Sequence, residues 1–69
     1  MLVSVENKFR DRTRKVIEEL LEDEKSISNI HSDRLEFEEL IEEFSEKASF
    51  EELMEVVEEE IYDFKNSNF

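Results

Sequence analysis

Apolar residues between positions 4 and 24 recur at intervals of three and four, a spacing typical of one face of a helix. The stripe consists of Phe9, Thr13, Val16, Ile17, Leu20 and Leu21. We expect Ser4 to cap the start of this helix and Glu6 to supply the negative charge favoured in a first turn. The pattern therefore predicts one long helix over about residues 4–24.

The helical spacing is interrupted over residues 25–32, which read KSISNIHS. Ser and Asn side chains form hydrogen bonds with their own backbone, so they favour a connector over a continuing helix. Ile27 and Ile30 are expected to point into the core and to give this connector a fixed path.

A second helix is predicted over about residues 33–47. Asp33 and Glu36 form a pair similar to a capping box at its start. Its apolar stripe consists of Phe37, Leu40, Ile41, Phe44 and Ala48.

A third helix is predicted over about residues 50–65, because Ser49 and Glu52 form a complete S-x-x-E capping box in front of it. Ala48 is placed to pack against Leu53 across this start. Asn66, which tolerates a left-handed backbone, is expected to end the helix before a polar tail over residues 66–69. The apolar stripe consists of Phe50, Leu53, Met54, Val57, Ile61 and Phe64.

Residues 37–42 and 50–55 share the form FEELhE, where h is hydrophobic, at an offset of thirteen residues. In one continuous helix this offset would turn the two stripes about 140° apart, so they could not share a core. A break near Ala48 removes the conflict and predicts an antiparallel helical hairpin. The motif is common in amphipathic helices, so it indicates no duplication.

The chain has 69 residues with no Gly and no Pro, which removes the usual turn residues of β-hairpins. We therefore predict a single all-α domain over residues 1–69: a long first helix plus the hairpin. A chain this short buries only about 60% of its unfolded surface, so we expect a homodimer or larger assembly to complete the core. The predicted core comprises Phe9, Val16, Leu20, Leu40, Phe44, Leu53, Val57 and Ile61. The predicted oligomer interface comprises Leu2, Val5, Val56 and Tyr62.

Several functional classes are excluded by what the sequence lacks. Without Cys it has no disulfide and no thiolate metal site, and without Gly it has no phosphate-binding loop, so we expect no cofactor. The apolar opening over residues 1–5 is interrupted by Ser4 and has no basic flank before it, so we expect neither a signal peptide nor a membrane span there. We expect a cytoplasmic protein that is not an enzyme. His31 stands alone in the connector without a nucleophile at a suitable spacing.

The charge is strongly negative and unevenly placed. Nine basic residues face 21 acids, for a net charge of -12, yet five of the basic residues lie within residues 1–15. They are Lys8, Arg10, Arg12, Arg14 and Lys15. We interpret this cluster as structural, with Glu6 paired to Arg10 and Asp11 to Lys15 at four-residue spacing, because so few cations on so acidic a chain would bind nucleic acid or a membrane weakly.

The third predicted helix carries seven acids and no base between residues 50 and 64. One interpretation is a solvated face partly neutralised by the basic start of the first helix. Another is a docking face for a basic protein, with nucleic-acid mimicry as its narrower form. A carboxylate metal site is disfavoured, since no Glu-x-x-His pair is present. The candidate docking residues are Glu39, Glu43, Glu46, Glu52, Glu55, Glu59 and Asp63.

Unpartnered acids would also make the fold more stable as the pH falls, since repulsion favours the neutral carboxyl group. In its short, acidic and helical character the chain is similar to antitoxins, bacteriocin immunity proteins and phage inhibitors of host defence, which is analogy of general shape. We therefore expect a binding inhibitor of a basic, nucleic-acid-handling protein. The alternative is a structural subunit that self-assembles through its helix stripes.

Overall fold

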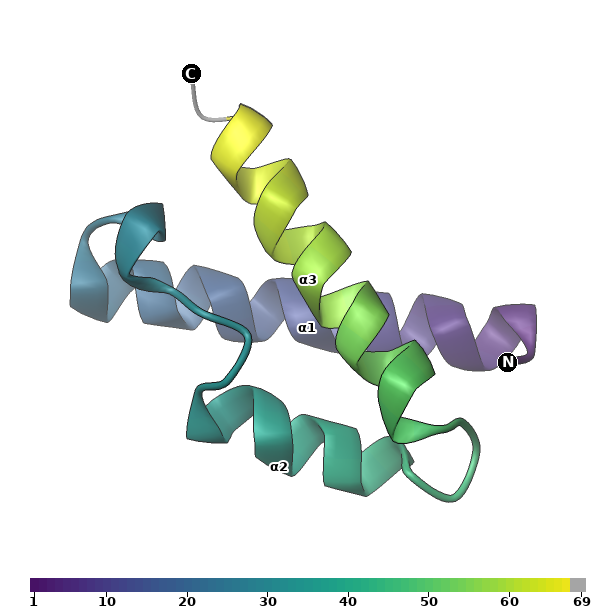
Figure 1. The fold of residues 1–69 in the computed structure, drawn as a ribbon. Coiled ribbons are helices and arrows are strands. Elements are labelled where there is room, and N and C mark those ends of the chain that lie inside the picture. The colour runs from purple at the N-terminus through teal and green to yellow at the C-terminus, as the bar shows by residue number, and fades with distance from the viewer. Residues whose placement is uncertain (68–69) are drawn as a thin grey trace.

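A computed structural model describes residues 1–67 and gives an all-helical fold, with no strand in that range. The elements are α1 (Val3–Glu24), the short 3-10 helix η1 (Ile27–Asn29), α2 (Leu35–Phe44) and α3 (Phe50–Ser67). The all-α prediction with three α-helices is confirmed for the described residues. Figure 1 shows α1 and α2 running in opposite directions, with α3 crossing α1 obliquely.

The predicted caps of α1 and α2 are wrong, because the backbone starts both helices elsewhere. In α1 the Glu6 amide donates to the Leu2 carbonyl oxygen at 2.9 Å, so Leu2 is the N-cap and Ser4 already lies inside the helix. In α2 the N-cap is Arg34, which leaves Asp33 in the preceding turn. Neither cap residue uses its side chain to cap the backbone amides of the helix start.

The turn between α2 and α3 is longer than predicted. The Ser45 amide and hydroxyl both donate to the Glu42 carbonyl oxygen, at 3.2 and 2.8 Å, which ends α2 at Phe44. The predicted Ser49 cap is confirmed, because its Oγ accepts the Glu52 amide at 3.2 Å. At the other end α3 extends through Asn66, which is therefore not its cap, while residues 68–69 of the predicted tail lie outside the described residues.

The connector takes the fixed path that the sequence predicts. Ile30 is fully buried and Ile27 packs against the core. Lys25 ends α1 in the left-handed region, at φ 62°, and its amide donates to the Leu21 carbonyl oxygen at 2.8 Å. A lysine in this region carries a steric cost that a glycine would avoid.

The core forms where the three helices and η1 meet. Of the predicted core residues, Val16 and Phe44 are only partly buried and pack against the edge of the core. There the rings of Phe44 and Phe9 meet edge-to-face, with their centroids 5.1 Å apart. The other predicted core residues are buried. The full buried apolar set is Phe9, Ile17, Leu20, Ile30, Phe37, Leu40, Ile41, Leu53, Val56, Val57 and Ile61.

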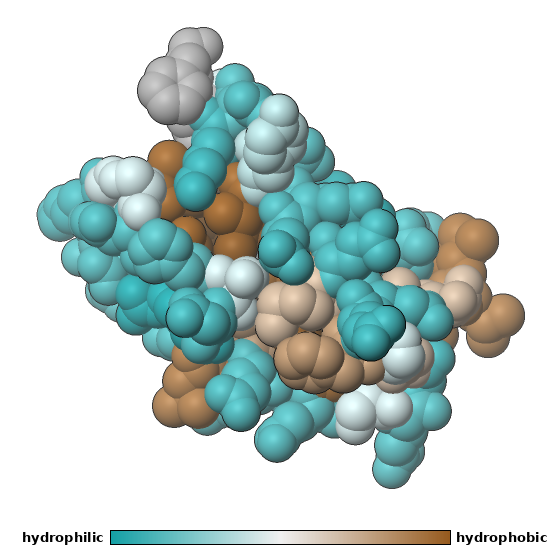
Figure 2. All heavy atoms as spheres, viewed as in Figure 1, coloured by the Kyte–Doolittle hydropathy of each residue, from teal (hydrophilic) through white to brown (hydrophobic). Residues whose placement is uncertain are grey.

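Two expectations about packing change. Of the four residues predicted to form an oligomer interface, Val56 is only 4% exposed and belongs to the core, so it is not free to contact another copy. Val5 is half-buried, whereas Leu2 and Tyr62 are 73% and 66% exposed. Because α3 turns back from α2 at an oblique angle, the predicted antiparallel hairpin of these two helices is not confirmed (Figure 1). The face shown in Figure 2 is mostly hydrophilic, with hydrophobic side chains gathered in a few places.

Candidate protein-binding surfaces

The basic start of α1 is clamped to α3 by a buried carboxylate. Glu60, whose side chain is 3% exposed, accepts hydrogen bonds from Arg10 Nη1 at 3.2 Å and from Arg14 Nε and Nη2 at 3.0 and 3.2 Å. Arg10 also bonds Glu59 at 2.7 Å and Glu6 at 3.1 Å. We call these residues of α1 and α3 the arginine clamp.

The clamp confirms that the first helix partly neutralises the third from within the molecule. Hydrogen bonds from Arg10 to Glu59, Glu6 and Glu60 raise its pKa above the ordinary value despite opposing desolvation. The hydrogen bond to Glu60 raises the pKa of Arg14 in the same way. Both guanidinium groups therefore remain charged throughout the physiological pH range.

The predicted pairs within α1 are only partly right. The pair between Glu6 and Arg10 is confirmed, but Asp11 pairs with Arg14 at 3.6 Å instead of with Lys15. Neither the Lys8 nor the Lys15 side chain has a hydrogen bond or ion pair within residues 1–67. The cluster is structural for its arginines, whose planar forks suit carboxylates.

Three of the predicted docking acids are already paired inside the protein. Glu59 belongs to the arginine clamp, and Glu43 accepts both nitrogens of Arg12 at 3.1 and 3.0 Å. Glu52 lies 3.0 Å from the N-terminal ammonium of Met1. These carboxylates have less charge to offer a partner than the sequence suggests.

Three further acids of α3 lie around an exposed aromatic ring. A surface hollow of about 500 Å³ is lined by Glu55, Glu58, Glu59, Tyr62 and Asp63. Among the described residues, no hydrogen bond or ion pair engages the side chains of Glu55, Glu58 or Asp63. We call this hollow the α3 surface. It brings together three of the predicted docking residues and adds Glu58 and Tyr62.

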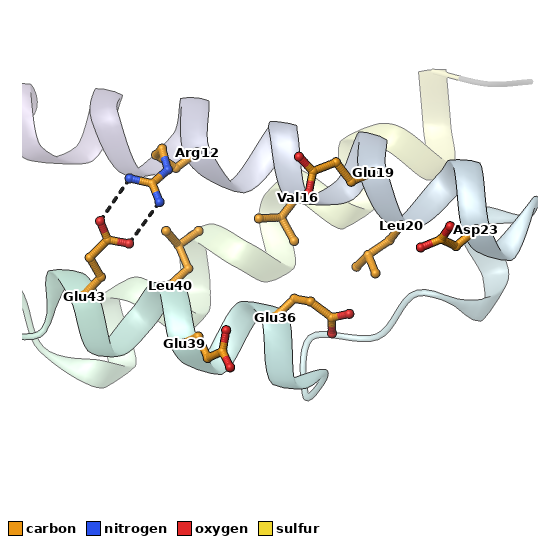
Figure 3. Close-up of a pocket in the computed structure, with 9 residues that line it drawn as sticks. All are labelled: Arg12, Val16, Glu19, Leu20, Asp23, Glu36, Glu39, Leu40 and Glu43. Carbon is orange, nitrogen blue, oxygen red and sulfur yellow. Dashed lines mark hydrogen bonds and ion pairs between the residues drawn. The ribbon is translucent and has the colours of Figure 1, made fainter.

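Glu39 and Glu43 lie on a different surface, in a groove between α1 and α2 (Figure 3). The groove has a volume of about 310 Å³. Its apolar floor is formed by Val16, Leu20 and Leu40, which point between the helices. The polar rim consists of Arg12, Glu19 and Asp23 from α1 and Glu36, Glu39 and Glu43 from α2. Glu46 follows α2 in the turn, exposed and outside both hollows.

Glu36 differs from the other groove acids, because it is stabilised at the start of α2. Its own backbone amide, together with a 3.4 Å contact to Arg34, holds the pKa of this carboxyl below its ordinary value. Arg34 also bonds Glu24 at 2.7 Å, which raises the arginine's pKa and ties α2 to the end of α1.

His31 lines a third hollow with Ile30, Ser32, Asp33, Glu58, Ile61, Tyr62 and Lys65. Its side chain forms no hydrogen bond or ion pair inside residues 1–67, and no nucleophile and base are paired there. Within the same range, no cluster of three His, Asp or Glu side chains is arranged to hold a metal ion. None of the described helices combines the length and the apolar character that crossing a membrane requires.

The comparisons with known proteins add no relative: no family model, curated protein or solved structure matches the chain.

The sequence interpretation missed Glu60 as a buried residue. It lies three and four positions after Val57 and Val56, and seven after Leu53, so it shares their face of α3. A carboxylate at such a position signals a buried ion pair. Its partners depend on where α3 crosses α1, forty-six and fifty residues away in sequence.

Proposed function

We propose that this chain is a small protein-binding module that docks onto a basic protein through its acidic surfaces and thereby inhibits it. The observation that carries the proposal is the α3 surface, where Tyr62 is two-thirds exposed beside three carboxylates without an internal cation. The fold already neutralises Glu59 and Glu60 on the neighbouring face of α3. The acids around Tyr62 therefore remain available to positive charge from outside.

The combination of a tyrosine with surrounding carboxylates suits a Lys/Arg-rich partner. Tyrosine is enriched at the energetic centres of interfaces, and its ring face attracts a guanidinium or ammonium group. Carboxylates around it steer a basic partner toward the surface and speed association. Mixed hydrophobic and ionic contact gives more specificity than charge alone.

Inhibition follows from what a basic protein surface usually binds. Proteins that handle nucleic acids use Lys and Arg to neutralise phosphates, and this contact supplies much of their affinity. An acidic module that covers such residues competes directly with the nucleic acid. This argument supports the antitoxin, immunity or anti-defence type of inhibitor over a passive acidic protein.

The test is affinity capture from a lysate of the source cells, with bound proteins identified by mass spectrometry. We expect basic proteins that are retained by the wild type and lost by the variant Glu55→Lys/Glu58→Lys. The matched control is Glu18→Lys/Glu22→Lys, which makes the same change in charge on exposed residues of α1 outside every hollow described above. If both variants retain or both lose the same proteins, the α3 surface has no specific role.

Self-assembly is the second candidate, favoured by exposed apolar side chains where the starts of α1 and α3 meet. Leu2 and Val3 are about three-quarters exposed and Phe50 more than half, and the contact between Met1 and Glu52 joins the two helix starts. Mutual repulsion between copies of net charge -12 opposes such an assembly. Sedimentation velocity over a wide concentration range, with Leu2→Ser/Val3→Ser as the variant, tests it; a monomer at every concentration removes this candidate.

A further inference from the structure

The groove between α1 and α2 holds one arginine of the protein itself. At one end, Arg12 reaches from α1 to α2 and donates to both oxygens of Glu43 (Figure 3). This pair demonstrates that a guanidinium fits between the two helices and is held there by an α2 carboxylate. The geometry is the paired, parallel contact that arginine forms best with a carboxylate.

Beyond Arg12 the groove is lined by carboxylates, three of which have no cation partner within the described residues. About two and three turns beyond Arg12, α1 presents Glu19 and Asp23, and α2 presents Glu39 one turn before Glu43. None of these three carboxylates has a cation partner among residues 1–67. They flank the apolar floor from both helices (Figure 3).

We propose that this groove receives a helix of the basic partner that carries two Lys or Arg residues one helical turn apart. The groove acids repeat at one-turn intervals along both helices, so cations at the same interval meet carboxylates on either side. The aliphatic stems of those side chains pack against Val16, which is partly exposed, whereas Leu20 and Leu40 beneath it are already buried in the core. This inference rests on the proposed function, since it gives the same basic partner a second contact.

Charge complementarity favours this occupant over a second copy of the chain. A second copy brings a net charge of -12, and three of its five N-terminal cations are engaged with carboxylates of their own molecule. A basic helix brings positive charge without that repulsion. It also fills an elongated groove that already lies between two helices.

The experiment uses two capped, alanine-based helical peptides as probes for the full chain. Both contain two arginines, placed four residues apart in one peptide and two residues apart in the other. The composition and charge are identical, and only the first peptide places both arginines on one face. Binding is measured by titration followed by backbone amide NMR, at low and at high salt.

We expect the four-spaced peptide to bind about two- to fivefold more tightly, because two partly exposed ion pairs form instead of one. The shifted amides should gather around Val16, Glu19 and Leu40. The variant Glu19→Gln/Glu39→Gln should lose this preference, while Glu18→Gln/Glu22→Gln, with the same charge change outside the groove, should keep it.

Equal binding of the two peptides, no binding, or shifts centred on Tyr62 would each overturn the groove assignment. In those cases the proposed function still stands if capture of the cellular partner depends on Glu55 and Glu58. Conversely, the peptide test can succeed while capture of the cellular partner does not depend on Glu55 and Glu58. In that case the groove still recognises the peptide, and the α3 surface has no role in binding. The two proposals therefore fail by different measurements.

Discussion

Replacing Glu60 with Gln tests whether the arginine clamp holds α3 against α1. The substitution keeps the shape of the side chain but removes its charge, and the amide nitrogen can no longer accept from a guanidinium. Glu60 accepts three hydrogen bonds from two arginines at 3.0–3.2 Å, with its own side chain 3% exposed. The full charge of the carboxylate is therefore paired inside the fold.

The magnitude lies between two limits. Removing one partner of a fully buried ion pair costs about 3–5 kcal/mol, whereas an exposed pair contributes about 0–1 kcal/mol. Arg10 and Arg14 are 23% and 50% exposed, so water compensates both in part. We expect a loss of about 2 kcal/mol, which for a domain of this size lowers the Tm by about 8–16 °C.

The control is Glu43→Gln, which makes the same change in net charge at an ion pair that is half exposed on both sides. We expect its cost to stay below about 1 kcal/mol. Thermal and urea unfolding followed by circular dichroism measure both variants. If Glu60→Gln lowers the Tm no more than Glu43→Gln does, the clamp is a surface pair and the reasoning from burial is refuted.

Two further substitutions follow from the backbone and from the start of α2. The variant Lys25→Gly should be more stable than Lys25→Ala by about 1 kcal/mol, because only glycine adopts the left-handed φ of 62° without steric cost. The greater backbone freedom of glycine in the unfolded chain offsets part of this gain. Equal urea midpoints for the two variants would contradict this. Glu36 has a folded pKa below its ordinary value, so its stabilising contribution is present above the unfolded pKa of about 4 and is lost as the pH falls through the folded pKa. Glu36→Gln should therefore lower the Tm at pH 7 and leave it unchanged near pH 2, and a Tm difference that persists in acid would show that charge is not the cause.

The helices could be predicted because apolar spacing is a local property, but their ends could not. The starts of α1 and α2 use backbone hydrogen bonds without a side-chain cap, so Ser4 and Asp33 gave a false signal. At Ser49 the cap uses a side chain, and there the sequence predicts the start correctly. The prediction therefore succeeds where the chemistry that ends a helix is in the side chains.

The sequence predicts that the candidate site is acidic, but it does not predict which acids come together there. An acidic third helix is visible in the sequence, yet which acids remain free depends on α3 crossing α1 and being packed by α1, α2 and η1 together. That packing buries Val56 and Glu60 and brings Glu59 to Arg10. Glu55, Glu58 and Asp63 remain on the surface of the protein. Contacts between residues so distant in sequence have no signature in local spacing.

The division of the acids also bears on their pH dependence. Stability that rises as the pH falls requires acids repelling one another without partners, yet Glu60 is bound to two arginines and Glu43 to one. Protonating a carboxylate that is paired with a cation removes a favourable contact, whereas protonating one that lies only among other acids relieves repulsion. In acid, the effects of the paired and the unpaired acids on stability therefore oppose each other.

A basic partner would pair the acids that are free in the chain alone, so binding should make the stability of the complex more sensitive to acid than that of the chain alone. Melting curves of free and bound protein at pH 7 and pH 4 would measure this difference, and an equal fall in Tm for both would argue that the bound carboxylates do not carry the interaction.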